Sequence, residues 1–509
     1  MQNACKKIKD EKRKAGILLP LFSLPSGEGI GTLGKETYFF VDWLKKSGMK
    51  IWQVLPLLPT NYGDSPYQSC ASDALNFYFI DLAQLVSEGL LEKSDCENLD
   101  WGDSSRVDYG KLFAWKANLL KIAFSRFNAD TGGWKDFLRE GKYYDFALFM
   151  ALKSKFDYKP WTEWDEPYKK GERAAIEEFE KKNREDIEFW QFTQYLFLKQ
   201  WNRLKEYANA RGISIMGDMP IYVAYDSVET WKYRKDLFIL GKDGNPSLRA
   251  GVPPDAFSDE GQLWGNPVYD WEKMKKDDYV WWKKRIEYAF TLFDIVRIDH
   301  FRGFDRFYTV AEDSDTAKEG KWRQGPGASL FKTFKEKAIV AEDLGIIDDG
   351  VREMMKQTGY PGMKVLSFGF NGDPDNEHKA SNHEKNVYAY TGTHDNAPVM
   401  EMLEEFETDK LENFRVEMTV ENERLGLTFE PTEKEPLRAL CENLLEQLFA
   451  SKADVAIAPM QDVLYFGKGS RVNSPSTVSD ANWTYRFKKE DFSPAAAKKL
   501  SALTKKYQR

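Results

Sequence analysis

The feature of this sequence that most constrains its fold is an alternation of short apolar runs with longer helical patterns. Helical periodicity marks residues 189–212, 279–293 and 437–453. Between such patterns lie six strand-like runs that end in polar residues, at 50–59, 214–223, 293–299, 338–345, 386–396 and 454–462. Strands that alternate with helices along a chain are typical of a parallel sheet. The sequence therefore predicts an α/β fold.

The predicted strands carry acidic residues at their C-terminal ends, where a (β/α)8 barrel, or TIM barrel, keeps its active site. We therefore expect residues 1–509 to form a single barrel body with insertions. Residues 81–186 are charge-rich and helical in pattern, and residues 226–277 are loop-rich and expected to cover the cleft. A smaller insertion is expected at 400–436.

Composition excludes several classes of protein. The net charge is −8 and no dense Lys/Arg stripe is present, so nucleic acid is not an expected partner. The N-terminus lacks an apolar signal-peptide core and the longest apolar runs are too short to span a bilayer, so no membrane partner is expected. The four cysteines, at positions 5, 70, 96 and 441, are too scattered for a disulfide framework. A cytoplasmic protein is predicted.

The run from Phe293 to Phe307, "FDIVRIDHFRGFDRF", has a charged face. Residues two apart in a strand share a face, so Ile295, Arg297 and Asp299 point one way while Val296 and Ile298 point into the opposite core. A lone strand of this kind is most simply an edge strand whose charges meet solvent. Other strand ends in this chain carry similar residues.

The ends of barrel strands converge on one mouth, so their polar residues are expected to form one site. These residues are Asp218, Arg297 with Asp299, Glu342 with Asp343, and His394 with Asp395. Several carboxylates and an arginine in a common cleft suit glycoside chemistry, which needs a nucleophile, a proton donor and negative charge beside a developing oxocarbenium ion. Taken singly, "EDLG" more often marks a helix start with Asp343 as its cap.

Three motifs carry a resemblance to a known family. "RIDHFRG", "VAEDLG" and "TGTHDN" resemble the catalytic motifs of the 4-alpha-glucanotransferases, also called amylomaltases or disproportionating enzymes, of glycoside hydrolase family 77 in the α-amylase superfamily. Five further stretches are similar to that family in the same order, from about Gly16 to Phe487: "GILLPLFSLPSGEGIGTLG", "VLPLLPTNYGDSPYQS", "GDMPIYVAYDS", "GVPPDAFSDEGQLWGNPVYDW" and "SRVNSPSTVSDANWTYR".

The resemblance implies catalytic roles for three carboxylates. Asp299 would be the nucleophile that forms a covalent glycosyl-enzyme, and Glu342 the general acid and then base. Asp395 would grip the hydroxyls of the transferred sugar and help distort its ring, with His394 bonding beside it. Arg297 shares a strand face with Asp299, so it is expected to hold that carboxylate ionised and oriented.

The remaining motifs imply sugar-binding residues. Tyr67 matches the family position whose ring stacks on the sugar at the cleavage point, and Asp218 matches a support residue at a neighbouring strand end. In the segment that resembles the family's cleft-covering loop, Trp264 and Asp255 are expected glucan contacts; a buried structural role is the alternative for Trp264. Asn473 in "SRVNSP" is a further expected contact.

Two stretches depart from the family pattern. "APVMEML" follows "TGTHDN" where the family usually continues with an acidic residue and a Gly-Trp pair, and "CASDALNFYF" replaces a small Gly-Asn-Pro-like stretch. Neither touches the expected catalytic carboxylates, so both are expected to affect acceptor binding.

Three other functions fit parts of this sequence less well. A metal-dependent barrel hydrolase would use the His and Asp pairs at 299–300 and 394–395, but the chain has four histidines and no HxH or HExxH pattern. His378 and His383 lie in a polar stretch and are expected to be solvated. An inactive glucan-binding protein is disfavoured because all three acids are present. An α-glucan hydrolase of the same superfamily is the closest alternative.

The sequence and the resemblance together predict a 4-alpha-glucanotransferase. It would pass part of a malto-oligosaccharide or starch-fragment donor to the 4-hydroxyl of a glucose or glucan acceptor by a retaining double displacement. No organic cofactor and no metal are expected, and the protein is expected to act as a monomer or homodimer.

Overall fold

The computed structural model describes residues 13–61, 63–254, 259–345, 347–428 and 435–509. Eight parallel strands pair in the order β10-β11-β12-β1-β2-β3-β6-β9. Their bounds are β1 (Lys14–Leu18), β2 (Ile51–Gln53), β3 (Ser214–Met219), β6 (Ile295–Ile298), β9 (Ile339–Ala341), β10 (Gly362–Val365), β11 (Val387–Tyr390) and β12 (Val455–Pro459). β12, the last strand of the chain, pairs with β1, the first, and the eight strands form a nearly closed barrel. The predicted (β/α)8 barrel is confirmed.

The seam of the barrel lies between β9 and β10, where the described residues form no ladder. One backbone bond crosses it, from the Ala341 N–H to the Pro361 carbonyl at 2.9 Å. Two side chains accept the β10 amides that a neighbouring strand would otherwise bind: Asp343 accepts from Met363 at 2.6 Å, and His378 Nδ1 accepts from Val365 at 3.1 Å. Side chains therefore replace a strand at this edge.

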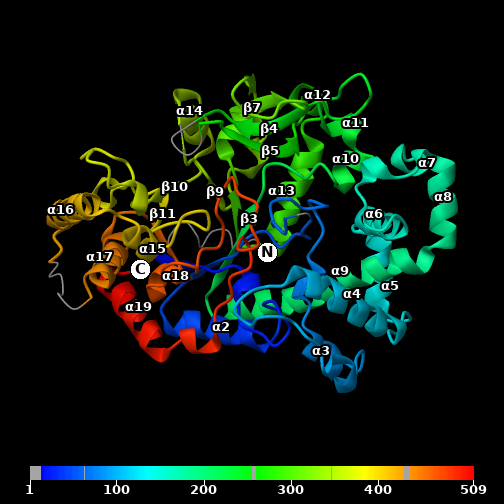
Figure 1. Cartoon of the computed structure of the whole chain (residues 1–509), viewed down its shortest axis with the longest axis horizontal. Helices are drawn as coiled ribbons and strands as arrows, with labels where there is room; N and C mark the ends of the chain where they lie inside the picture. The colour runs from blue at the N-terminus through cyan, green and yellow to red at the C-terminus, as the bar shows by residue number, and fades with distance from the viewer. Residues whose placement is uncertain (1–12, 62, 255–258, 346, 429–434) are drawn as a thin grey trace.

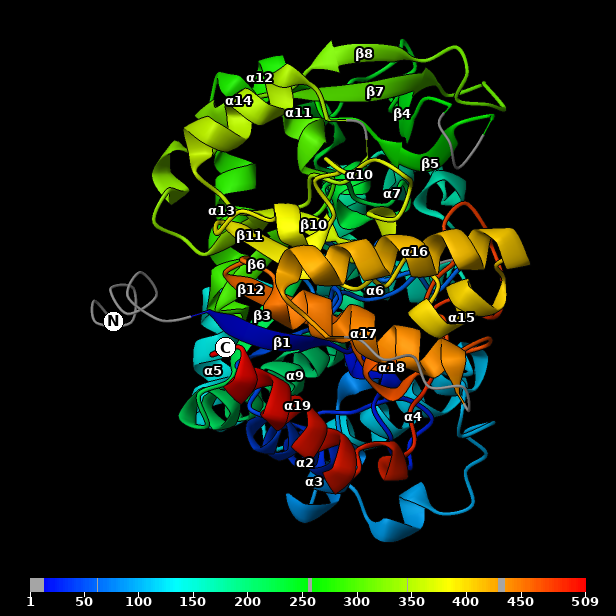
Figure 2. The same cartoon turned by 90° about the vertical axis from the view of Figure 1, so that its left-hand side faces the viewer.

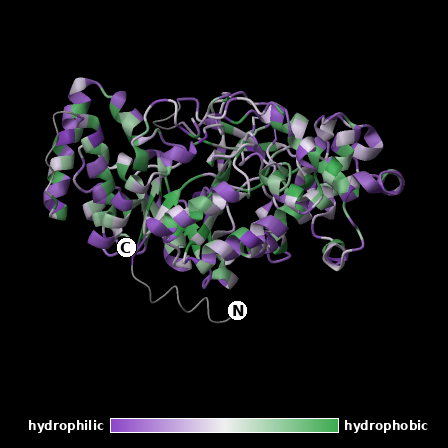
Figure 3. Cartoon of the chain, turned by 90° about the horizontal axis from the view of Figure 1, so that it is seen from below, coloured by the Kyte–Doolittle hydropathy of each residue, from purple (hydrophilic) through white to green (hydrophobic). Residues whose placement is uncertain are grey.

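The inside of the barrel is filled by one apolar cluster to which every barrel strand contributes, including Leu18, Ile51, Met216, Ile295, Val340 and Ile457. Val296 and Ile298, which alternate with Ile295 and Arg297 on β6, instead join the larger outer core beneath the helices. The predicted two faces of this strand are confirmed. Figure 3 shows the hydrophobic residues gathered toward the centre and hydrophilic ones on the outer helices.

Helices cover the outside of the barrel, and the three predicted from periodicity are confirmed as α9 (Arg184–Ala210), α13 (Val280–Leu292) and α17 (Pro436–Ala450). Four more helices are α2 (Lys35–Lys46), α14 (Asp349–Thr358), α18 (Met460–Leu464) and α19 (Pro494–Lys506). Of these, α18 packs against β12, and α2 packs between α9 and α19. None of the helices in the described ranges is long and apolar enough to cross a bilayer.

The long connection from β2 to β3 holds α3 (Leu82–Ser87), α4 (Tyr109–Ser125), α5 (Gly132–Glu140), α6 (Tyr144–Lys155), α7 (Glu166–Lys169) and α8 (Arg173–Lys182). Helices α4 to α8 gather at one end of the molecule (Figure 1). The connection from β3 to β6 holds α10 (Val228–Lys232), α11 (Arg234–Leu237) and α12 (Trp271–Lys275), and that from β11 to β12 holds α15 (Val399–Glu404) and α16 (Thr408–Leu425). We propose that residues 81–186, 226–277 and 400–436 are insertions into one barrel body.

A second, antiparallel sheet stands apart from the barrel (Figure 2). Its strands β4 (Leu248–Val252), β5 (Gln262–Pro267), β7 (Arg306–Ala311) and β8 (Lys321–Gln324) pair in the order β5-β4-β7-β8. No local sequence pattern predicted this sheet. Its strands come from both sides of β6 in the chain, so the sheet joins two connections that leave neighbouring barrel strands.

Two expectations were wrong. His383 is buried and its Nε2 contacts the His378 carbonyl oxygen at 3.2 Å, while the His378 ring is engaged at the barrel seam. The polar residues around them face outward, but tertiary packing buries His383 and half-buries His378. Asp343 does not cap a helix either, because its carboxylate accepts from Met363 and the cap of α14 is Asp348.

Candidate active site

The centre of the site is a buried arginine that two strand ends share. The parallel register of β3 and β6 sets Asp218 beside Arg297. Nη1 of Arg297 lies 2.7 Å from both carboxylate oxygens of Asp218, and Nη2 lies 3.1 Å from Oδ1 of Asp299. Arg297 and Asp218 are almost fully enclosed, whereas the Asp299 side chain is 27% exposed. One guanidinium therefore orients a carboxylate that opens toward solvent.

The backbone turn after β6 connects this group to Glu342. His300 adopts a left-handed conformation, with φ 45°, and its N–H donates to Oε2 of Glu342 at 2.8 Å. The Leu344 N–H donates to Oε1 at 2.8 Å, and the Phe301 N–H binds the Glu342 carbonyl at 2.9 Å. The residue that follows Asp299 thus holds the carboxyl group of Glu342.

The two carboxyl groups occupy contrasting environments. Burial raises the pKa of Glu342 to about 7; Arg297 and the two backbone N–H groups oppose this rise, and the charge of Asp299 adds to it. Asp299 is half-buried and paired with Arg297. A carboxyl group that keeps its proton near neutral pH, beside an ion-paired carboxylate, has the division of roles that an acid and a nucleophile require.

The third predicted acid, Asp395, lies on the segment that follows β11. Its Oδ1 accepts from Nδ2 of Asn473 at 2.6 Å, and its backbone carbonyl accepts from Nη2 of Arg471 at 2.7 Å. Nε2 of His394 lies 3.3 Å from Oδ2. Two chain segments that are more than 70 residues apart in the sequence therefore meet at this carboxylate.

Aromatic rings connect Asp395's segment to the arginine centre. The Tyr67 hydroxyl donates to Oδ2 of Asp218 at 2.8 Å. The Tyr67 ring stacks on the His394 ring, with centroids 5.3 Å apart and planes 9° apart, and Trp483 contacts both rings at 5.8 and 6.0 Å. The structure thus brings Tyr67, Asp218, Arg297 and His394 into one connected group.

Trp264 stands at the other side, on β5. Its ring meets that of His300 edge-on at 4.9 Å, and its Nε1 donates to Oε1 of Gln262 at 3.1 Å. The side chain is half-buried, so part of it remains exposed to solvent. Gln68 binds the Trp264 carbonyl at 3.0 Å and so connects the Tyr67 turn to β5. Asp255, the other residue expected in this segment, lies outside the described residues.

Sequence reasoning missed Arg471, Trp483 and Gln68. Arg471 and Trp483 lie within "SRVNSPSTVSDANWTYR" and Gln68 lies within "GDSPYQS", so the motifs had located the segments but not these residues. Their contacts within the site are with residues far away in the sequence: Arg471 with Asp395, Gln68 with Trp264 and Trp483 with Tyr67. The sequence signal for them was their place in the motifs: Gln68 follows Tyr67, Arg471 lies two residues before Asn473, and Trp483 lies further along the same motif.

No group of three or more His, Cys, Asp or Glu side chains within the described ranges is arranged to hold a metal ion. Burial lowers the pKa of His300 to about 4, so its ring is neutral at physiological pH.

Known proteins are similar to this chain over nearly all of its length. The family model described as 4-alpha-glucanotransferase matches residues 19–491. The chain is 42% identical to the 4-alpha-glucanotransferase of Clostridium butyricum over 96% of this chain and 99% of the relative, and 39% identical to that of Thermus thermophilus over 98% and 99%.

A solved structure agrees across the whole fold. The amylomaltase from Streptococcus agalactiae in complex with acarbose superposes with a TM-score of 0.92 at 40% identity, covering 98% of this chain and 100% of that one. The amylomaltase of Corynebacterium glutamicum, at 17% identity and a TM-score of 0.76, shares the fold. With a family model that spans nearly all of its length and relatives that match it from end to end, the chain belongs to the 4-alpha-glucanotransferase family.

Proposed function

We propose that this 4-alpha-glucanotransferase acts on α-1,4-glucans by a retaining double displacement. The donor is a malto-oligosaccharide or starch fragment, and the acceptor is the 4-hydroxyl of glucose or of another glucan. The observation that carries the proposal is the contrast between Asp299, paired with Arg297, and the buried Glu342, whose pKa is raised to about 7.

In the first step, a carboxylate oxygen of Asp299 attacks the anomeric carbon as the bond to the leaving sugar breaks. Glu342 gives its proton to the leaving oxygen, so the reducing-end fragment departs neutral. In the second step, Glu342 takes the proton of the acceptor 4-hydroxyl, which displaces Asp299. Retention by this route requires carboxyl groups about 5–5.5 Å apart. The hydrogen bond from the N–H of His300, the residue after Asp299, to Glu342 supports such closeness.

Around the sugar at the cleavage point, we assign binding to Asp395, His394 and Tyr67. The Oδ2 of Asp395 lies beside His394, while its Oδ1 is held by Asn473. This leaves Asp395 fixed in orientation before substrate arrives. Preorganised acceptors of this kind act on sugar hydroxyls as the ring distorts in the transition state. We propose that acarbose occupies the same cleft.

The acceptor sugar is assigned to Trp264. Once Asp299 carries a glucan, water competes with the acceptor, so a transferase must supply effective concentration and alignment through acceptor binding. A half-buried ring edge-on to His300, the neighbour of Asp299, provides a stacking surface next to the reacting centre. Pro253 and Pro254 restrict the chain that leads toward it.

The mechanism is tested by trapping the intermediate. Glu342→Gln supplied with glucosyl fluoride should accumulate a glucosyl ester on Asp299, because fluoride leaves without a proton and the second step lacks its base. Intact-protein and peptide mass spectrometry measure the adduct. The matched control adds Asp299→Asn to the same variant and should show no adduct. Fluoride release without any adduct would rule out a covalent intermediate.

The acceptor assignment is tested on maltotriose. The wild-type protein should form glucose and longer oligosaccharides with few new reducing ends. Trp264→Ala should lower the ratio of transfer to hydrolysis by about tenfold, and lower donor cleavage less, because the carboxylates remain. An unchanged ratio would place acceptor selection elsewhere, and wild-type protein that only accumulates reducing ends would make it a hydrolase.

A cytoplasmic location completes the proposal. The three cysteines that the structure describes are free, as expected of a reducing compartment. The protein would act as a monomer or a homodimer.

A further inference from the structure

The segment that carries His394 and Asp395 is fastened at both ends by one buried carboxylate. Asp462 lies near the start of α18, is 4% exposed, and uses one oxygen for each end. Its Oδ2 accepts from the Thr391 hydroxyl, and its Oδ1 accepts from the Val399 N–H at 2.8 Å. Residues 391–399 are thereby pinned into a closed turn. Asp462 touches neither Asp395 nor any other carboxylate through these bonds.

The adjacent residue fastens the second segment that meets Asp395. Nε2 of Gln461 donates to the Ser470 carbonyl at 3.0 Å, and Gln461 is 2% exposed. Ser470 directly precedes Arg471, and Asn473 follows two residues later. One short helix therefore anchors both segments whose contact fixes Asp395.

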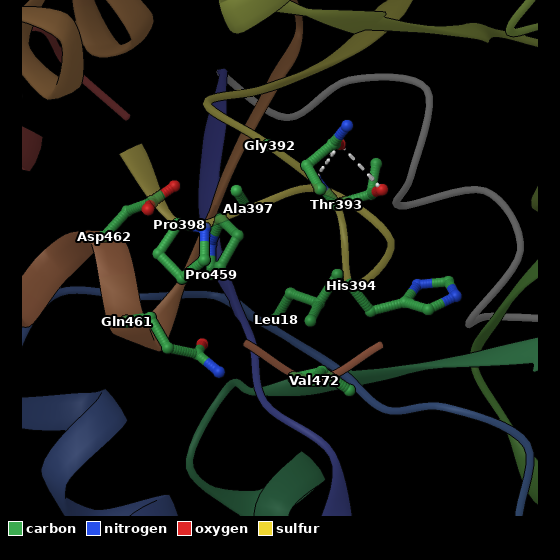
Figure 4. A pocket seen from close by; sticks show the side chains of 11 residues that line it. Leu18, Gly392, Thr393, His394, Ala397, Pro398, Pro459, Gln461, Asp462 and Val472 are labelled. Atoms are coloured by element: carbon green, nitrogen blue, oxygen red, sulfur yellow. Dashed lines mark hydrogen bonds between the residues drawn. The ribbon is translucent and has the colours of Figure 1, made fainter. Parts of the chain in front are cut away.

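A small hollow separates these segments behind the site (Figure 4). Gly392, Thr393, His394 and Pro398 line one side, and Val472 lines the other. Inside the turn, Oδ1 of Asn396 accepts from the Thr393 N–H at 2.8 Å and from the Thr393 hydroxyl at 2.9 Å. Asn396 thus holds the inside of the turn, and Asp462 holds its two ends.

The placement of Asp462 is costly, which argues for a specific role. Burial raises its pKa to about 6, and only the hydrogen bonds from Thr391 and Val399 oppose the rise. A buried carboxylate without a cationic partner is unfavourable unless its hydrogen bonds are required.

We propose that Asp462 is a positioning residue that sets the location of the Asp395 carboxylate by clamping residues 391–399 against α18. This inference rests on the proposed role of Asp395 in gripping the transferred sugar. Asp462 itself contacts no substrate.

The test is a double-mutant cycle on the affinity for acarbose, measured by titration calorimetry. Asp395→Asn should weaken binding by about a hundredfold and Asp462→Ala by about tenfold. The double variant should bind no more weakly than Asp395→Asn alone, because both changes act through one carboxylate. Asp462→Asn should restore affinity to within about threefold of wild type, because its amide oxygen accepts from Val399 and its amide nitrogen donates to Thr391.

A matched control separates positioning from general destabilisation. Glu421 is also buried, and it accepts from the Ser381 N–H at 2.6 Å and hydroxyl at 2.9 Å. Glu421→Ala should lower the urea unfolding midpoint about as much as Asp462→Ala, yet leave acarbose affinity unchanged. If Asp462→Ala does not fold, Thr391→Val, which removes a single hydroxyl, takes its place in the cycle.

The outcomes are distinguishable. Suppose that Asp395→Asn weakens binding. If Asp462→Ala alone has no effect, or if it weakens binding as much in the double variant as it does alone, the positioning role is wrong while the role of Asp395 stands. Equal losses in the Glu421 control would likewise overturn it. If Asp395→Asn leaves affinity unchanged, the proposed role of Asp395 fails and the inference falls with it.

Discussion

The two halves of the site are held in different ways. On the side of β3 and β6, Asp218, Arg297 and Asp299 are placed by strand register and joined by a buried ion-pair network. On the side of β11 and β12, Asp395 stands on a segment beyond its strand and is placed by hydrogen bonds from Asn473 and Arg471.

The two sides therefore differ in what a substitution changes: the stability of the fold on one side, and the position of the Asp395 segment on the other. Charges buried in the barrel mouth must stay paired, so a change there is expected to disturb folding as well as chemistry. On the second side, the hydrogen bonds of Asn473 and Arg471 to Asp395 are only partly buried, so their loss mainly lets a segment shift. The two sides should therefore fail in different ways when a single residue is changed.

The largest effect is expected from breaking the ion-pair side. Arg297→Met leaves two carboxylates without their cation and should cost about 3–5 kcal/mol of unfolding free energy, with loss of nearly all transfer activity. Urea denaturation and maltotriose turnover measure the two effects. In Arg285→Met, the control, a buried guanidinium that donates to the Pro220 and Ile221 carbonyls is lost, and the cost should be nearer 1–3 kcal/mol. Equal losses of unfolding free energy in the two variants would show that the ion-pair network contributes no more than another buried arginine does.

A smaller, graded effect is expected from pH. The general acid must be protonated in the free enzyme, and the pKa of Glu342 is raised to about 7. kcat/KM should therefore hold below pH 7 and fall about tenfold per pH unit above it. Initial rates on maltotriose across pH 5–9 measure this limb. With glucosyl fluoride as donor, Glu342→Gln should show no such limb in the first step; a limb that survived there would belong to another group.

The smallest effect is expected on the segment side. Asn473→Ala removes one hydrogen bond to Asp395 and leaves Arg471 in place, so kcat should fall about tenfold with an unfolding free energy within about 1 kcal/mol of wild type. The same two assays apply. A loss of stability as large as that of Arg297→Met would abolish the distinction between the two sides.

The same contrast explains what the sequence could predict. Alternation in "FDIVRID" located β6 and both of its faces because a strand's side-chain pattern is local. The motifs located Asp299, Glu342 and Asp395 in their segments. β10, with only four residues that begin with glycine, and the antiparallel sheet had no comparable local pattern, because their pairing depends on residues far apart in the chain.

Tertiary contacts account for most of what was missed in the site. Arg471 reaches Asp395 from a segment that crosses over from the end of β12, and nothing in its own neighbourhood indicates this. Asp462 was visible as the polar end of the strand-like run 454–462, but its work on Thr391 depends on how β11 and β12 lie together. Such roles follow from packing and not from periodicity.

The seam between β9 and β10 gives this barrel a point of acid sensitivity. The acceptor for the Val365 amide is a neutral imidazole, and burial lowers the pKa of His378 to about 4. Between about pH 6.5 and pH 4 the unfolded chain takes up a proton on this ring that the folded chain refuses, so acid progressively favours the unfolded chain. Strands joined by carbonyl oxygens have no such titration. Amide hydrogen exchange in mild acid should therefore find the barrel opening first beside Glu342, with Val365 losing protection before the amides of β1 and β12.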